Sequence, residues 1–159
     1  MTLERPRYFK GGLITAEDLT QDQLYNREKA RRHNRLLHGW GIVRGLELAG
    51  AGGSDVTVSP GYALDRRGEE IVVEDEVTLD LAGKPHGKPL FVVVRHDETL
   101  VRPVPIPGGQ EFSRIRDGFC FEALAALPQS HEPWVILGDV VLGPRGRIAI
   151  GTEHRRLLV

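Results

Sequence analysis

The 159-residue chain is 40% hydrophobic and 27% charged, proportions that are ordinary for one compact domain with a hydrophobic core. Its 21 Lys and Arg residues nearly balance its 22 Asp and Glu residues, so the net charge of -1 excludes a general electrostatic attraction to nucleic acid or anionic membranes. Cys120 is the single cysteine, which excludes an internal disulfide and gives no sign of an oxidising compartment.

The first 14 residues carry two aromatic side chains and no targeting signal. The stretch "MTLERPRYFKGGLI" lacks the apolar region of a secretory signal peptide, and no part of the sequence reaches the roughly 18 apolar residues of a membrane span. We therefore expect synthesis in the cytoplasm and no membrane partner. Tyr8 and Phe9, between Pro6 and Gly11, predict an extended arm over residues 1–14 that docks through its two rings.

A long helix is predicted over about residues 16–38, inside a segment that spans residues 15–39. Thr15 and Asp18 form a capping box, acidic residues fill the first turn, and Gly39 supplies a stop signal. These signals agree on where the helix begins and where it ends.

The predicted helix is unusually polar. One face has helical spacing but is half polar, and it consists of Leu19, Gln23, Asn26, Ala30, His33 and Leu37. Burial of apolar area alone does not hold such a helix. Its Asn and His side chains need hydrogen-bond partners, because an unpaired buried polar group costs roughly 1 to 3 kcal/mol. The β domain or another copy of the chain must supply these partners, so the helix predicts assembly.

Short strands are predicted over residues 40–159. Alternating patterns occur in "IVRGLELAG" and "DVTVSPG", "YALDRRGEEIVVED" indicates two strands around a turn, "PLFVVVRHDE" is apolar enough for a central strand, and "WVILGDVVLGPRGRIAIG" indicates a hairpin. "FCFEALAAL" fits a strand or a short helix. The linkers at residues 50–54, 83–89 and 103–110 are too short to divide domains. The expected fold is α+β, mainly β, with one long N-terminal helix and an antiparallel sandwich or barrel-like body.

The sequence contains no catalytic, cofactor-binding or metal-binding motif. The six histidines form no HExxH or H-x-H set, and His33 and His38 lie about 500° apart around an α-helix, so we expect that they cannot face one ion without unwinding. The glycine-rich "GAGGSD" lacks the Lys-Ser/Thr of a phosphate loop. We therefore predict a protein that is not an enzyme and needs no cofactor.

Two other function classes stay open. A β-rich enzyme or small-ligand-binding protein could draw a dispersed site from Asp65, Arg95, His96 and Arg114. A nucleic-acid adaptor could use the basic end of the helix, but the helix has no aromatic platform for bases, and its acid-first, base-last order is what its dipole favours. The basic residues concerned are Arg27, Lys29, Arg31, Arg32 and Arg35.

The sequence resembles one family in an ordered series of motifs. The segments "YFKGGLITAEDLTQDQLYNREKARRHNRLLHGWGIVRGLEL" and "VTVSPGYALDRRGEEIVVEDEVTLDL" are similar to small proteins of phage-tail-like particles, the extracellular contractile injection systems. This resemblance covers about residues 8–81. The later "FSRIRDGFCFEAL", "WVILGDVVL" and terminal Arg-Arg resemble, more loosely, β-rich segments at the bases of phage tail fibres. Where the family pattern often has Cys before "GLE", this chain has Arg44.

The resemblance implies a structural component of a particle that can leave the cell, located near the baseplate or the tail-fibre attachment. Its expected partners are other particle proteins and further copies of itself, with a homotrimer as the first expectation. Aromatic and arginine anchors usually dominate such interfaces. In this arrangement Asn26 and His33 would set the register, and Trp40 would fill the gap between helix and sheet. The interface residues expected on this basis are Tyr8, Phe9, Leu19, Tyr25, Asn26, Ala30, His33, Arg35, Leu37 and Trp40.

Overall fold

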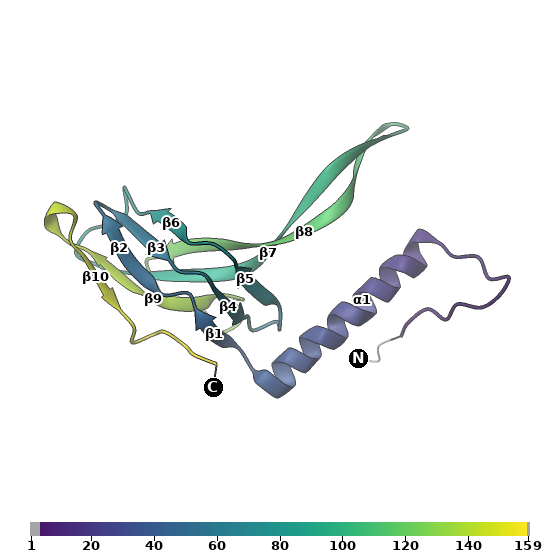
Figure 1. The fold of residues 1–159 in the computed structure, drawn as a ribbon, viewed down its shortest axis with the longest axis horizontal. Helices are drawn as coiled ribbons and strands as arrows, with labels where there is room; N and C mark the ends of the chain where they lie inside the picture. Colours follow the sequence, from purple (N-terminus) through teal and green to yellow (C-terminus); the bar gives the residue numbers. More distant parts are fainter. Residues whose placement is uncertain (1–3, 159) are drawn as a thin grey trace.

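A β-rich body carries one helix and one long β-hairpin, which project on the same side of the molecule (Figure 1). The computed structural model describes residues 4–158. The helix α1 spans Ala16–His33 and continues as a π-helical turn over Asn34–His38. This confirms the predicted helix. Its capping box is formed, because the Thr15 hydroxyl oxygen accepts the Asp18 N–H at 3.2 Å and the Asp18 carboxylate accepts the Thr15 N–H at 3.0 Å.

Ten strands follow within the described part of the chain, and they form three antiparallel sheets of order β1-β4-β5, β2-β3-β6 and β10-β9-β7-β8. This confirms a mainly β fold with one N-terminal helix. A short 3-10 turn, Pro144–Gly146, lies between the last two strands. The strands are β1 Gly41–Gly45, β2 Leu48–Gly52, β3 Asp55–Val58, β4 Gly61–Leu64, β5 Glu70–Val73, β6 Val77–Asp80, β7 Pro89–Ile106, β8 Gly109–Leu124, β9 Val135–Leu142 and β10 Ile148–Gly151.

One hydrophobic core joins the three sheets. Alternate residues of the short strands point inward, as in β5, where Ile71 and Val73 are buried and their neighbours are exposed. Residues 90–94 of β7 are buried whichever face they point to, and in this part of the strand β7 pairs with β9 at one edge and, from Phe91 onward, with β8 at the other. The core is made of Ile42, Leu46, Val56, Val58, Ala63, Ile71, Val73, Leu81, Leu90, Val92, Val94, Val135, Leu137, Val140 and Leu142.

Most of the predicted strands are confirmed. The "YALDRRGEEIVVED" segment forms the β4–β5 hairpin, "PLFVVV" lies in the central strand β7, and "FCFEAL" is a strand rather than a helix. Phe119 and Phe121 pack against the core, and Cys120 between them points to the other face of the strand; all three side chains are half-buried.

The predicted linker over residues 103–110 is wrong. Residues 103–106 and 109–110 belong to β7 and β8, which pair as far as Ile106 and Gly109. The segment contains three prolines, and the two in β7, Pro103 and Pro105, lie beyond Val94, where β7 last pairs with β9. From there outward β7 pairs only with β8, so a proline that lacks an N–H is tolerated on its free edge. The predicted linker at residues 50–54 is likewise partly strand, since β2 extends to Gly52.

Candidate interaction surface

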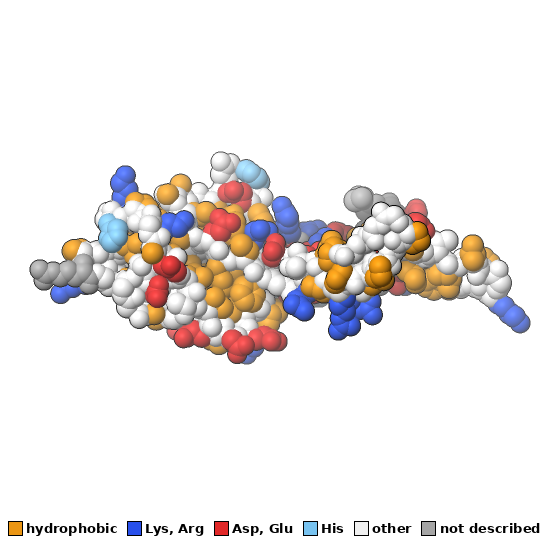
Figure 2. Space-filling view, turned by 90° about the horizontal axis from the view of Figure 1, so that it is seen from above, with side chains coloured by type: hydrophobic (Ala, Val, Ile, Leu, Met, Phe, Trp, Pro, Cys, Tyr) orange, Lys and Arg blue, Asp and Glu red, His pale blue; other side chains and the backbone are white. Residues whose placement is uncertain are grey.

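Three parts of the chain project from the body with apolar side chains exposed. They are the N-terminal arm, residues 4–14; the helix with its π-turn, residues 16–38; and the distal hairpin, residues 98–118. In Figure 2 hydrophobic side chains, in orange, lie at the surface of this projecting half beside clusters of Lys and Arg. The exposed large hydrophobic residues in these parts are Tyr8, Phe9, Leu13, Ile14, Leu19, Leu24, Leu36, Leu37, Leu100, Val104, Ile106, Phe112 and Ile115.

The distal hairpin is a two-stranded ribbon. Every residue from 98 to 118 is exposed except the half-buried Val101. Two-stranded ribbons are marginally stable in water without a packing surface, and contiguous exposed apolar side chains mark protein-binding surfaces. The distal hairpin therefore has the properties of a segment that is covered in an assembly.

The N-terminal arm lies beside the helix and is not helical in its described residues. The Gln21 amide donates to the Glu4 carbonyl at 3.1 Å, and the Arg5 guanidinium lies 5.7 Å from the centre of the Tyr25 ring. Tyr8 and Phe9 do not dock on their own chain, since half of Tyr8 and 68% of Phe9 are exposed. Their predicted docking thus needs another surface.

The helix is held to the body by charge rather than by burial. None of the residues of α1, all of which the structure describes, is buried. The Arg27 guanidinium contacts Glu69 at 2.9 Å and also pairs with Glu98 of β7, and Arg31 pairs with Glu69 and with Glu28. Glu69 is thus the common acceptor of two helix arginines.

The pKa values of this cluster follow from its contacts. Burial raises the pKa of Glu69, but the hydrogen bonds from Arg31 and Arg27 outweigh it, and the net pKa is lowered. The hydrogen bond to Glu69 raises the pKa of Arg31. Glu69, His96 and Glu98 offer three ligand atoms within 4.8 Å of one another. Because Arg27 contacts both carboxylates, the cluster is compensated by guanidinium and is not arranged for a metal ion.

The turn between β4 and β5 approaches the helix backbone. Asn34 donates to the Gly68 carbonyl at 2.9 Å and Arg35 to the Arg67 carbonyl at 2.6 Å. The turn itself is organised by Asp65, whose carboxylate accepts the N–H groups of Arg67 and Glu69 at 2.8 and 2.9 Å. Burial raises the pKa of Asp65, and these two hydrogen bonds oppose the rise. The helix thus rests on a preformed turn.

Trp40 forms the joint between the helix and the first sheet. Its ring is half-buried between two guanidinium groups, with Arg66 3.7 Å and Arg156 4.2 Å from the ring centre. Arg156 also donates to the Trp40 carbonyl at 3.2 Å. Cation–π contacts of this kind contribute about 0.5 to 2 kcal/mol each, so the C-terminal segment stabilises the joint.

The sequence predicted that His33 and His38 cannot face one ion unless the α-helix unwinds, and the structure departs from an α-helix at this point. Their Nε2 atoms lie 3.2 Å apart. The expectation assumed an α-helix, but residues Asn34–His38 form a π-turn, closed by the Gly39 N–H on the Asn34 carbonyl at 2.9 Å. An i to i+5 turn is wider than an α-helical one, so residues five apart come together.

Several helix residues predicted for an interface are exposed to solvent in the single chain. Leu19 is 54% and Leu37 70% exposed, and Ala30 is exposed. Asn26 is exposed too, but its amide already donates to the Asp22 carbonyl at 3.0 Å. The polar groups of the helix thus find part of their partners within the chain.

The four residues of the dispersed-site alternative do not converge. Asp65 is committed to its turn, Arg95 pairs with Asp97 at 3.1 Å, and Arg114 lies on the exposed distal hairpin opposite Val101. His96 alone lines the groove of about 400 Å³ between helix and body. The nucleic-acid alternative also loses support, because Arg27 and Arg31 of the basic run are paired with glutamates.

Arg155 is a structural residue that the sequence did not single out. Its guanidinium donates to the carbonyls of Gly45, Leu46 and Leu137 at 2.6, 2.7 and 3.1 Å. In the sequence this residue stands out only as part of the terminal Arg-Arg, and that pair does not indicate what the two arginine side chains contact. The distal hairpin was missed as well, because its prolines hid its strand character.

Replacing Glu69 with glutamine is expected to lower the free energy of unfolding by about 1 to 2 kcal/mol at pH 7, because both guanidinium partners are partly solvated. Its lowered pKa means that this contribution is complete above the ordinary value of 4.5 and is lost as the pH falls through the folded-state pKa. Denaturant unfolding at pH 7 and in the acid range measures both effects. Glu74→Gln, an exposed glutamate just after β5, is the control, and an equal loss in both variants would contradict the role of Glu69.

Solved structures with the same fold come from baseplates of the type VI secretion system. Chains in structures described as the baseplate complex from the type VI secretion system and as its TssK-TssF-TssG baseplate subcomplex match 96% of this chain, each with a TM-score of 0.62, at 15% and 16% identity. A crystal structure of TssK matches 95% of this chain with a TM-score of 0.58 and 13% identity.

The match concerns the fold and only part of each neighbour. This chain corresponds to 59%, 61% and 41% of the lengths of those three chains. No protein-family model and no curated protein matches the sequence. Within residues 4–158, no helix combines the length and apolar character that crossing a bilayer requires. The fold of this chain is thus that of type VI baseplate components.

Proposed function

We propose that the protein is a structural component of the baseplate of a contractile, phage-tail-like injection particle, and that it works by binding neighbouring proteins. The observation that carries the proposal is the likeness to chains of type VI baseplate structures over 96% of the sequence. The resemblance of residues 8–81 to proteins of contractile injection systems points to the same class of particle. The neighbours' descriptions name a TssK-TssF-TssG subcomplex, so other baseplate subunits are the partners expected first.

The surface chemistry supports a binding role rather than a catalytic one. The charged groups beside the helix, among them Glu69 and Arg31, are engaged with each other. By contrast, the apolar side chains of the arm, helix and distal hairpin are exposed, as expected for surfaces that neighbouring subunits cover. Purified sheathed particles provide the test. We expect this protein to co-sediment with the particles, and a label directed at it should mark one end of each particle. A label spread evenly along the sheath would contradict the proposal, and so would absence of the protein from both particles and assembly intermediates.

A homotrimer at the tail-fibre attachment is the specific arrangement that we propose. The helix face with Leu19, Ala30 and Leu37 would line the contact, and Tyr8 and Phe9 would anchor the arm on a neighbouring copy. At micromolar concentration, light scattering should give three times the chain mass of 17.7 kDa. Because a charge in the apolar contact would have to be desolvated, Leu37→Glu should reduce the mass to that of one chain.

The matched control for this experiment is Leu127→Glu. Leu127 is 47% exposed and lies outside the three projecting parts, so its replacement should leave the mass of the assembly unchanged. A full-length protein that is monomeric at micromolar concentration, or a Leu37→Glu variant that behaves like the control, would rule out this arrangement.

A further inference from the structure

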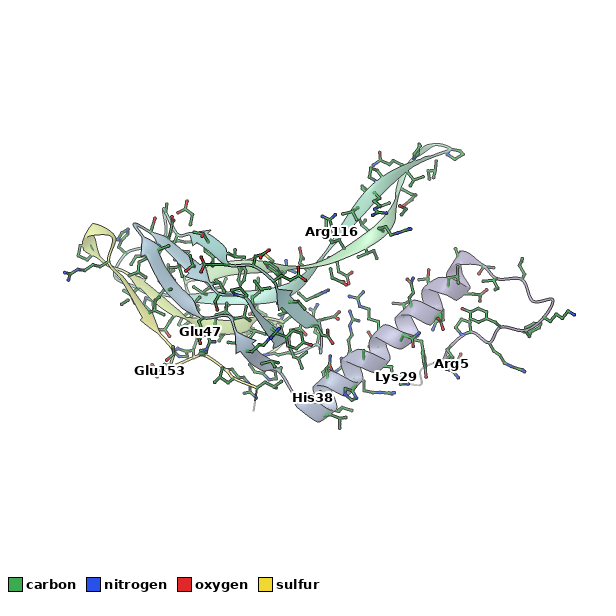
Figure 3. All side chains as sticks on the ribbon, viewed as in Figure 1. Arg5, Lys29, His38, Glu47, Arg116 and Glu153 are labelled. Carbon is green, nitrogen blue, oxygen red and sulfur yellow. The ribbon has the colours of Figure 1, made fainter. Side chains whose placement is uncertain are left out.

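Two histidines meet at the base of the helix. The Nε2 atoms of His33 and His38 are 3.2 Å apart, and their ring centres are 5.1 Å apart. Both side chains are exposed. Figure 3 labels His38 at the end of the helix that adjoins the β body. The π-turn Asn34–His38 is what brings the two rings together, and π-turns often occur at functional sites.

We propose that His33 and His38 chelate one divalent transition-metal ion through their Nε2 atoms. Bonds from imidazole nitrogen to Zn²⁺ are about 2.1 Å long, so two such ligands lie about 3.0 Å apart at a right angle and about 3.4 Å apart at a tetrahedral angle. The observed 3.2 Å lies between these values.

The separation of the rings fits the same arrangement. Two imidazoles that both point at one ion have ring centres about 4.6 Å apart at a right angle and about 5.3 Å apart at a tetrahedral angle, whereas two rings meeting head-on at this nitrogen separation are about 5.5 Å apart. The observed separation is 5.1 Å, with an angle of 59° between the ring planes. The two rings are therefore placed as a chelating pair.

The ligand type selects the class of ion. Neutral imidazole suits Zn²⁺, Cu²⁺ and Ni²⁺, whereas Mg²⁺ and Ca²⁺ prefer oxygen ligands. Because both rings are exposed, water completes the coordination. A bound ion links the last residue of α1, His33, to the last residue of the π-turn, His38, and so stiffens the connection through which the helix leaves the body. This site does not depend on the proposed baseplate function.

Titration of the tag-free, full-length protein with CuCl2 tests the proposal. We expect one equivalent of Cu²⁺ per chain, with two nitrogen couplings in the electron paramagnetic resonance spectrum. His33→Gln and His38→Gln should each weaken Cu²⁺ binding by about a hundredfold or more. In the original chain, an ion held by one imidazole is already close to the second, and each variant loses this chelate effect. Each variant should keep one nitrogen coupling at most. Zn²⁺ should displace Cu²⁺ when in excess, and Mg²⁺ should not.

The control is His131→Gln, since His131 is an exposed histidine in a loop of the body. This variant should bind Cu²⁺ as the original chain does, and circular dichroism should show all three variants folded. Equal affinity in the original chain and the His33→Gln variant, an equal loss in the His131→Gln variant, or half an equivalent per chain, which indicates an ion shared between copies, would each overturn the proposal.

Discussion

Replacement of Arg155 with methionine is expected to lower the free energy of unfolding by about 3 to 5 kcal/mol. The Arg155 guanidinium donates to three carbonyls: Gly45 at the end of β1, Leu46 in the β1–β2 connection and Leu137 in β9. Arg155 is half-buried, and its burial lowers the pKa of the guanidinium. Methionine fills similar space but leaves the three carbonyls without their donor. The C-terminal segment would then be tied to the first sheet only by other contacts, such as its backbone hydrogen bonds to Ile42.

Urea unfolding compares this variant with two others. Arg155→Lys should fall between the original chain and Arg155→Met, because an ammonium group keeps the charge but lacks the planar fork of a guanidinium. Arg116→Met replaces an exposed arginine of the distal hairpin (Figure 3) and should change the free energy of unfolding by no more than about 0.5 kcal/mol. Similar losses in Arg155→Met and Arg116→Met would show that the three hydrogen bonds contribute little.

Elements with local signals could be predicted from the sequence. The capping box at Thr15, the stop at Gly39 and the Arg-Arg-Gly turn each depend on residues close together in the chain, and the structure contains all three. The distal hairpin could not be predicted in the same way. Its prolines are tolerated only because β9 stops pairing at Val94, and that depends on the lengths of strands that are far apart in sequence.

The candidate surface was predictable only in part. The polarity of the helix predicted partners for its side chains, and Asn34, in the π-turn, donates to the Gly68 carbonyl of the β domain. The π-turn was hidden, because its residues Asn34–His38 carry no signal that distinguishes it from an α-helical turn. The proximity of His33 and His38 follows from that turn and therefore escaped the sequence too.

Gly68→Ala is expected to release the helix from the body and to lower the free energy of unfolding by about 2 to 4 kcal/mol. Gly68 has φ +84°, where an alanine costs about 1 to 2 kcal/mol. An added Cβ would also lie 2.3 Å from the Arg31 carbonyl oxygen, which is backbone and cannot rotate away. Backbone must therefore move, and the Asn34 hydrogen bond to Gly68 and the pairing of Glu69 would be disturbed with it.

Gly83→Ala separates the clash from the backbone strain. Gly83 has a nearly identical φ of +81°, but an added Cβ there meets nothing within 4 Å. Both variants pay the conformational cost, and only Gly68→Ala should also speed hydrogen exchange in α1 while the core strands stay protected. Equal exchange in the two variants would mean that the β4–β5 turn does not position the helix. Because no residue of α1 is buried, this close approach acts together with the ion pairs of Glu69 and Glu98 and the hydrogen bonds of Asn34 and Arg35 to determine how the helix is held on the body.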